Sequence, residues 1–213
     1  MTGPTPQPGN MPQDFVAFAA AWREDGITQL LGYVWAGYDS LRAENPVLPD
    51  PSDEVNINFL LVVHIDRKKP KNCPFDVQHT PPELSTRLGP SGPPPSPDIG
   101  FFPRTDLRLM FPLEAKVLKT DGHLSEYLKA LRTRFLQCRY APYSSEGAMI
   151  GYLLTGAPEV VFKKLRGRLR TPVEQHPDFP ARSHRISNHR RSHRRCRHCP
   201  PEFRCHHLVM VMR

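Results

Sequence analysis

The chain has 213 residues, a formal net charge of +8 and 25 prolines. This length suits one domain of about 100–150 residues with extensions, and the prolines indicate long irregular segments. Five cysteines, an odd number, are too few for a disulfide-built scaffold. No stretch is apolar enough to cross a bilayer, and residues 1–12 lack the pattern of a secretory leader. We therefore expect a cytoplasmic protein with no membrane association.

The positive charge is concentrated toward the C-terminus. Residues 163–204 contain 13 Lys and Arg against 3 Asp and Glu, whereas the rest of the chain carries a small net negative charge. This clustering favours nucleic acid as a partner, because basic side chains that neutralise phosphates release counterions. The alternative is a solvated basic segment with only nonspecific affinity.

The first third of the chain predicts helices. Residues 1–12 are rich in Pro, Gly and Thr and are expected to be disordered. Residues 14–22 predict a first helix, and the apolar spacing of residues 27–44 predicts a second one. Residues 55–65 are so densely apolar that a buried helix and a buried strand both remain open.

Strands are predicted in the middle of the chain. Residues 75–79 alternate as in a short strand, and the run from Pro81 to Pro97 contains seven prolines and must be a loop. Residues 98–102 and 107–118 are both strand-like. The turn-forming residues between them predict a β-hairpin.

The last part of the chain adds further alternating elements. It predicts a helix at 124–136, a strand at 148–153, a helix at 158–169 and a strand at 203–212. This order indicates an α/β fold with a central mixed sheet flanked by helices. We divide the chain into a disordered N-terminus (1–12), one folded domain (13–170), an irregular basic segment (171–202) and a C-terminal strand (203–213).

Two short motifs in the predicted hairpin carry the candidate chemistry. Asp98 begins the first strand, and Glu114 and Lys116 share one face of the second because alternate strand residues point the same way. Asp98 and Glu114 could hold Mg²⁺, with Mn²⁺ as an alternative, and the ion would activate a water molecule. Lys116 could orient that water or balance charge in the transition state. The competing interpretation is an ordinary strand with an exposed ion pair.

Asp106 competes with Asp98 as the second acidic ligand. If the hairpin turns at residues 103–105, Asp106 and Glu114 lie on one strand about 26 Å apart and cannot share an ion. Asp98 then lies across from about residue 110, where twist or a bulge could bring it to Glu114. If the chain instead turns at Phe111, Asp106 becomes the ligand. We favour Asp98.

The spacing of Pro97-Asp98 and Glu114-Ala115-Lys116 resembles the motif of the PD-(D/E)XK nuclease superfamily, which includes many restriction endonucleases. The resemblance implies a restriction-endonuclease-like core and a metal-dependent nuclease that hydrolyses the phosphodiester bonds of DNA. Asp98 and Glu114 would bind the metal and Lys116 would assist hydrolysis. Some members have lost catalysis, so a catalytically silent module that binds DNA or protein is the alternative.

The resemblance covers about residues 44–155 and, more faintly, residues 205–208, and it is to small bacterial proteins of unassigned substrate. It implies a role in bacterial defence or DNA processing, with partner proteins from the same system or a second copy of the chain. An acidic residue from the preceding helix often joins the metal site in this superfamily, and Glu44 is the candidate here.

Further residues are candidates for contact with nucleic acid. The helix after the Glu-x-Lys strand and the basic segment supply Gln137, Arg139, Arg190, Arg191, Arg194 and Arg195. A second metal site could form from Cys196, Cys199, Cys205 and His206, which suit zinc by ligand type. We expect no zinc there, because adjacent residues of a strand point apart.

Overall fold

The computed structural model describes residues 26–44, 50, 52–83, 94–104, 109–140, 142–191 and 199–212. The disorder predicted at residues 1–12 and the helix predicted at residues 14–22 lie outside the described residues.

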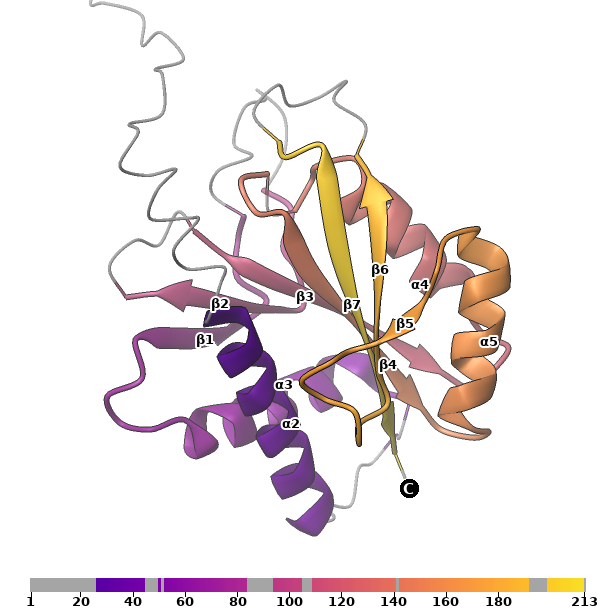
Figure 1. Ribbon diagram of the computed structural model, residues 1–213. Coiled ribbons are helices and arrows are strands. Elements are labelled where there is room, and N and C mark those ends of the chain that lie inside the picture. The colour runs from indigo at the N-terminus through magenta and orange to yellow at the C-terminus, as the bar shows by residue number, and fades with distance from the viewer. Residues whose placement is uncertain are drawn as a thin grey trace, which may run out of the picture.

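One seven-stranded mixed sheet forms the centre of the fold (Figure 1). Its strands are β1 (Phe75–His79), β2 (Ile99–Pro103), β3 (Phe111–Leu118), β4 (Glu146–Leu153), β5 (Glu174–Gln175), β6 (His184–Arg190) and β7 (Glu202–Val211). They lie side by side in the order β1-β2-β3-β4-β7-β6-β5. The central strands β3, β4 and β7 are parallel, and the outer pairs are antiparallel. The predicted α/β class with a mixed sheet is confirmed.

Helices cover both faces of the sheet. They are α2 (Gly26–Glu44), α3 (Glu54–Lys68), α4 (Ser125–Ala130), which continues into the π-helical turn η2 (Leu131–Phe135), and α5 (Pro158–Leu169). Helices α2 and α3 pack on one face, whereas α4, η2 and α5 pack on the other. None of these described helices combines the length and apolar character needed to cross a membrane.

The segment that the sequence left open between helix and strand is helix α3. Asp53 caps its N-terminus, because the Asp53 carboxylate accepts a hydrogen bond from the Asn56 backbone N–H over 3.1 Å. The buried face of the helix carries Ile57, Leu61 and Ile65 together with the polar Asn58 and His64, and Val55 and Phe59 are exposed on its outer side. The sequence therefore showed apolar residues on both sides, which concealed the helical period.

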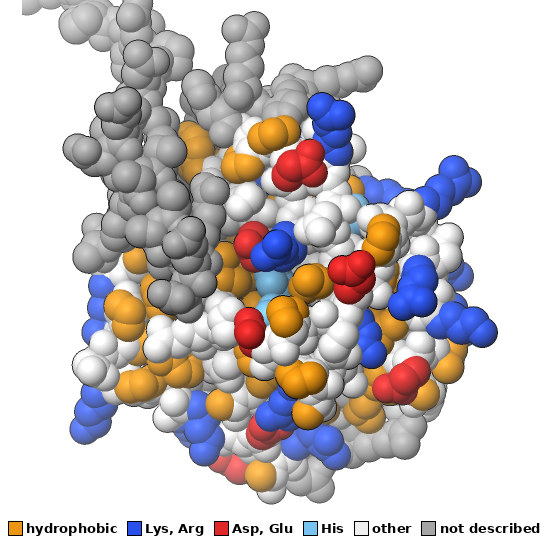
Figure 2. Space-filling model, viewed as in Figure 1, with side chains coloured by type: hydrophobic (Ala, Val, Ile, Leu, Met, Phe, Trp, Pro, Cys, Tyr) orange, Lys and Arg blue, Asp and Glu red, His pale blue; other side chains and the backbone are white. Residues whose placement is uncertain are grey.

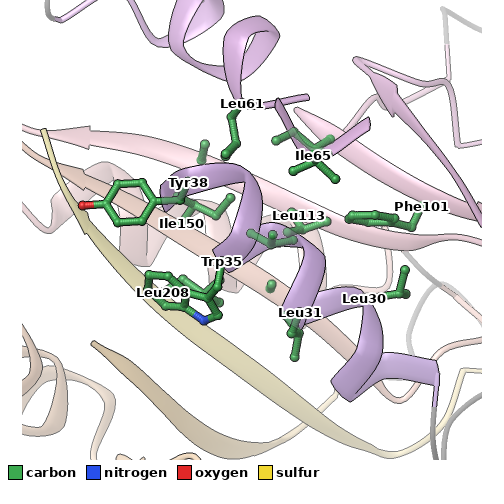
Figure 3. Packing of buried hydrophobic residues seen from close by; sticks show 14 of the residues in the cluster. Leu30, Leu31, Trp35, Tyr38, Leu61, Ile65, Phe101, Leu113, Ile150 and Leu208 are labelled. Carbon is green, nitrogen blue, oxygen red and sulfur yellow. The ribbon is translucent and has the colours of Figure 1, made fainter. Parts of the chain in front are cut away.

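The central strands are apolar at consecutive positions because they are buried on both faces. On β3, Leu113 and Ala115 belong to the core under α2 and α3, whereas Leu118 belongs to the core under α4 and α5. Figure 3 shows the first of these cores, in which Trp35 and Tyr38 of α2 lie against strand residues.

Close packing of α2 on α3 leads to a first prediction. A Cβ atom at Gly37 would lie 2.8 Å from the backbone nitrogen and 2.5 Å from Cγ1 of Ile65, so the two helices would have to separate. We expect Gly37→Ala to lower the free energy of unfolding by about 1–3 kcal/mol, as for other overpacked cores. The matched control is Gly32→Ala on the same helix, where nothing lies within 4 Å and a gain of about 0.5–1 kcal/mol is expected. Chemical denaturation would measure both, and equal effects would contradict this account of the helix contact.

The hairpin of β2 and β3 differs from the predicted one. Ile99 pairs with Leu113 and Phe101 with Phe111, so the connection spans residues 104–110 and is longer than the tight turn expected at 103–106. The longer connection shifts the register. Asp98, one residue beyond the last pair, therefore falls level with Glu114, and no bulge is needed to bring it there.

The prediction that residues 171–202 are irregular is wrong for two stretches. Strand β5 and the seven-residue strand β6 lie in this segment, and β6 pairs with β7 from His184 opposite Leu208 to Arg190 opposite Glu202. The buried positions of β6, His184 and Ser187, are polar. The alternation of apolar residues that usually predicts a strand is therefore missing from its sequence.

Candidate active site at the divergence of strands β2 and β3

Strands β2 and β3 separate beyond Leu113, and two carboxylates take the place of the missing partner strand. The Ala115 backbone N–H donates to the Asp98 carboxylate over 2.8 Å. The Val117 backbone N–H donates to the Glu54 carboxylate over 2.9 Å. These bonds satisfy amides that would otherwise cost about 1–3 kcal/mol each if buried without a partner. They also fix Asp98 and Glu54 beside β3.

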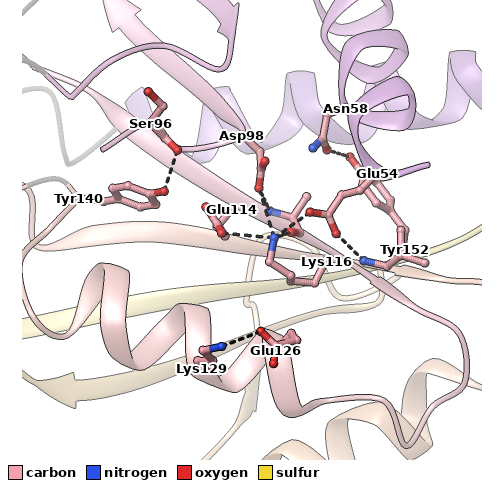
Figure 4. A network of polar contacts seen from close by, with 12 residues as sticks. Glu54, Asn58, Ser96, Asp98, Glu114, Lys116, Glu126, Lys129, Tyr140 and Tyr152 are labelled. Carbon is pink, nitrogen blue, oxygen red and sulfur yellow. Dashed lines mark hydrogen bonds and ion pairs between the residues drawn. The ribbon is translucent and has the colours of Figure 1, made fainter. Parts of the chain in front are cut away.

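The ammonium of Lys116 lies among three carboxylates (Figure 4). Its Nζ atom is 2.7 Å from Glu54 Oε1, 3.3 Å from Glu114 Oε1 and 3.8 Å from Asp98 Oδ2. The four side chains come from the start of α3, the residue before β2 and the middle of β3. Three acids around a single ammonium leave an excess of negative charge when all are ionised.

The pKa values of the two strand acids reflect this excess. Burial, followed by the charge of Asp98, raises the pKa of Glu114 to about 7. Burial also raises the pKa of Asp98, although the Lys116 ammonium and the Ala115 hydrogen bond oppose the shift. Burial lowers the pKa of Lys116, but the surrounding carboxylates outweigh it and hold that pKa above its ordinary value. The lysine stays charged, and Glu114 exchanges a proton near neutral pH.

Two side chains from the region after α4 border Glu114. The buried Tyr140 hydroxyl donates to the Ser96 carbonyl over 2.7 Å, and its pKa is raised by burial and by the charge of Glu114. The guanidinium of Arg134, in η2, lies 5.6 Å from the centre of the Tyr140 ring, and its charge lowers the pKa of Glu114. Turns of π-helix occur frequently at functional sites.

A buried amide lies on the opposite side of Glu54. The Tyr152 hydroxyl donates to Asn58 Oδ1 over 2.7 Å, and the charges of Asp98 and Glu54 contribute to a raised pKa of Tyr152 after burial. Asn58 is 1% exposed, and its Nδ2 atom has no hydrogen-bond partner among the described residues. The acidic group therefore has a buried amide donor on its α3 side.

The structure does not bring Glu44 to this group. Glu44 ends α2 and pairs with His64 and Arg67, each at 3.5 Å, in the last turns of α3. Glu54 lies in the first turn of that helix, more than two turns from His64. The acidic residue contributed by a helix is therefore Glu54 and not Glu44.

Glu54 was missed because its segment could not be assigned to a helix. The available signal was Asp53, which is an N-cap residue followed by an acid in the first turn. Asp98, the acid favoured from the sequence, lies near Glu114, because the Lys116 ammonium contacts both carboxylates. Its rival, Asp106, lies outside the described residues.

The residues proposed to contact nucleic acid differ in exposure. Gln137, Arg139 and Arg190 are exposed. Arg191 is only 3% exposed, donates to the Ser144 carbonyl over 2.6 Å and lies 4.1 Å from the centre of the Phe203 ring, so phosphate cannot reach it. The assignment of Arg191 to nucleic-acid contact is therefore corrected. Arg194 and Arg195 lie outside the described residues.

Two of the cysteines considered for zinc, Cys199 and Cys205, are buried. Cys205 is fully buried on β7, and burial raises the pKa of its thiol, which opposes the thiolate that zinc requires. A hydrogen bond from Cys199 and the charge of Arg191 lower the pKa of Cys138 to about 7, so Cys199 lies beside Cys138. Cys196 lies outside the described residues.

Comparison of the chain with protein-family models, with curated proteins and with solved structures gives no match. The chemistry of the site therefore has to be judged from its own residues. Carboxylate oxygens suit Mg²⁺, which commonly takes one or two carboxylates and completes its shell with water and phosphate. Asp98 and Glu114 supply such a pair, because Glu54 is engaged by Lys116 and by the backbone of Val117.

Proposed function

We propose that this chain is a metal-dependent nuclease with a restriction-endonuclease-like core that hydrolyses phosphodiester bonds in DNA. The observation that carries the proposal is the convergence of Asp98, Glu114 and Lys116 where β2 and β3 separate. Asp98 and Glu114 would hold the ion. Glu114 is partly protonated near neutral pH, and it would release this proton when the ion binds. Glu54 would orient Lys116.

The ion and the basic residues of the site would have separate roles in hydrolysis. A bound Mg²⁺ or Mn²⁺ ion would supply a water of lowered pKa and stabilise charge on the phosphate. The Lys116 ammonium, held by Glu54, would face the negative charge that develops as water attacks phosphorus and the phosphorus–oxygen bond to the leaving strand breaks. Arg134, whose charge already reaches Glu114, would contribute positive charge on the same side.

Basic side chains supply a surface for the phosphate backbone. Figure 2 shows Lys and Arg gathered on the side of the molecule that α5 forms. Gln137 and Arg139 follow the helix that borders Glu114 and are exposed, so they could contact a strand entering the site. Contacts of this kind are independent of sequence and weaken with salt.

Asp98→Asn tests the proposal directly. We expect the unaltered protein to cut plasmid DNA with Mg²⁺ or Mn²⁺ and to stop when a chelator is added. The Asp98→Asn variant should cut at least about 100-fold more slowly, because one metal ligand is removed. The matched control is Asp66→Asn, an exposed α3 residue paired with Lys69, which should cut normally. Cleavage that survives Asp98→Asn would refute the assignment. DNA binding without cleavage in any of the proteins would favour the catalytically silent module.

A further inference from the structure

Three histidines form a buried cluster on the face of the sheet that α2 and α3 cover. His184 on β6 and His206 on β7 point to this face, and His176 follows β5. Their exposures are 0%, 2% and 5%, and one ring nitrogen from each lies within 4.8 Å of the others. Glu114 and Lys116 do not share this face, because the alternate β3 residues Leu113 and Ala115 do.

Burial disfavours protonation of two of these rings, His176 and His184. Burial, followed by the charge of His206, lowers the pKa of His176 to about 4. Burial lowers the pKa of His184 even further, with contributions from the charges of His206 and His176. The lowered pKa values of His176 and His184 therefore have burial as their main cause.

A carboxylate lies behind one of the three rings, that of His206. His206 Nε2 lies 2.8 Å from Glu146 Oε2, which fixes the proton on Nε2 and leaves Nδ1 directed at His184 Nε2, 3.3 Å away. His176 Nδ1 instead accepts a hydrogen bond from the Asp178 backbone N–H over 3.2 Å. Histidines that bind metals usually donate their second nitrogen to a carboxylate, as His206 does to Glu146, which fixes the tautomer and makes the ligating nitrogen more basic.

The hydrogen bond between Trp35 and His184 would change if His184 bound a metal ion. Trp35 Nε1 donates to His184 Nδ1 over 3.3 Å, so His184 carries its proton on Nε2 and donates to His206. If His184 Nε2 became a metal ligand, the proton would move to Nδ1 and the contact with the indole N–H would be lost. A metal would thus replace the bond between His184 and His206 and change the surroundings of Trp35.

We propose that His176, His184 and His206 bind one transition-metal ion, for which Zn²⁺ is the best match, with water as the fourth ligand. Three imidazoles suit Zn²⁺ and do not suit Mg²⁺, which prefers oxygen. Phe179 stacks on His184 with ring centres 5.1 Å apart, so the cluster is covered by its own loop. The ion would fasten the segment after β5 to strands β6 and β7. It stabilises the fold and takes no part in phosphodiester hydrolysis.

The test uses the full chain, purified without an affinity tag of histidines and freed of metal. We expect ZnCl₂ to bind at about one ion per chain, to raise the melting temperature and to change Trp35 fluorescence in a Trp22→Phe background. His176→Gln should weaken zinc binding at least tenfold and abolish the thermal shift. This residue lies outside the strands, so its replacement puts the fold at little risk.

Two control variants make the outcome decisive. His207→Gln replaces an equally buried histidine on the opposite face of β7, and it should keep the zinc affinity. Cys196→Ser should also keep it. The proposal is overturned if His176→Gln binds zinc as tightly as the unaltered chain, or if Cys196→Ser is the variant that loses zinc. Equal loss in His176→Gln and His207→Gln would likewise reject the assignment.

Discussion

Replacing Glu114 by glutamine is expected to abolish metal-dependent cleavage and, above pH 7, to make the folded protein more stable. The pKa of Glu114 rises from its ordinary value of 4.5 to about 7 through burial and the charge of Asp98. Between these pH values the folded chain binds more protons at this group than the unfolded chain. The ionised carboxyl therefore lowers stability progressively as pH rises through this window.

The glutamine variant avoids the destabilisation caused by the ionised Glu114 carboxyl, because its amide is uncharged. We expect a gain of about 1–3 kcal/mol in the free energy of unfolding above pH 7 and little change at pH 4. Cleavage should fall at least about 100-fold, because the amide cannot replace the charged metal ligand. Denaturation at several pH values and a plasmid assay would measure the two effects.

Glu126→Gln is the matched control for this change. Glu126 is exposed on α4 and pairs with Lys129, so neither stability nor cleavage should change by more than a small amount. A Glu114→Gln protein that is less stable at pH 8 would show that the ion pair with Lys116 outweighs the repulsion. Wild-type metal affinity should also increase as pH rises through about 7, because Mg²⁺ must displace the Glu114 proton.

Lys116→Met is expected to be the most destabilising substitution at the site. It leaves Glu54, Asp98 and Glu114 without the ammonium that each of them contacts within 4 Å. Removing one partner from a largely buried ionic group costs about 3–5 kcal/mol, and the partial exposure of Lys116 places the expected loss nearer 2–3 kcal/mol at pH 8. Cleavage should be lost in the same variant.

Magnesium and acid should both rescue the stability of this variant. A divalent ion restores positive charge among the carboxylates, so MgCl₂ should raise the melting temperature of Lys116→Met more than that of the unaltered protein. The loss should also shrink toward pH 4, where Asp98 and Glu114 take up protons. Lys129→Met, at an exposed position on α4, provides the control and should respond to neither. No added stabilisation by MgCl₂ would argue against a cation site.

The acid–lysine core of the site could be predicted because strand geometry is regular. Alternation puts Glu114 and Lys116 on one face whatever the rest of the fold does. The choice of Asp98 over Asp106 rested on a hairpin with a tight turn, and the actual connection of residues 104–110 changes the register. Asp98 still lies level with Glu114, because Ile99 pairs with Leu113, and the expected bulge is not needed.

Contacts between elements distant in the chain could not be predicted in the same way. Glu54 reaches Lys116 across 62 positions, and such a pairing follows from how α3 packs on the sheet and not from local sequence. The histidine cluster has the same origin, since His176, His184 and His206 meet only when β6 pairs with β7. Polar residues at buried positions also concealed β6 itself.

The position of β7 has a consequence for how the chain folds. This strand comes after every other one in sequence, yet it lies between β4 and β6 in the sheet. Until residues 202–211 are in place, β4 presents an unpaired apolar edge and both layers of helices lack part of their support. The sheet is therefore completed only by a pairing between distant parts of the chain, and until then the β4 edge is open to association with other chains.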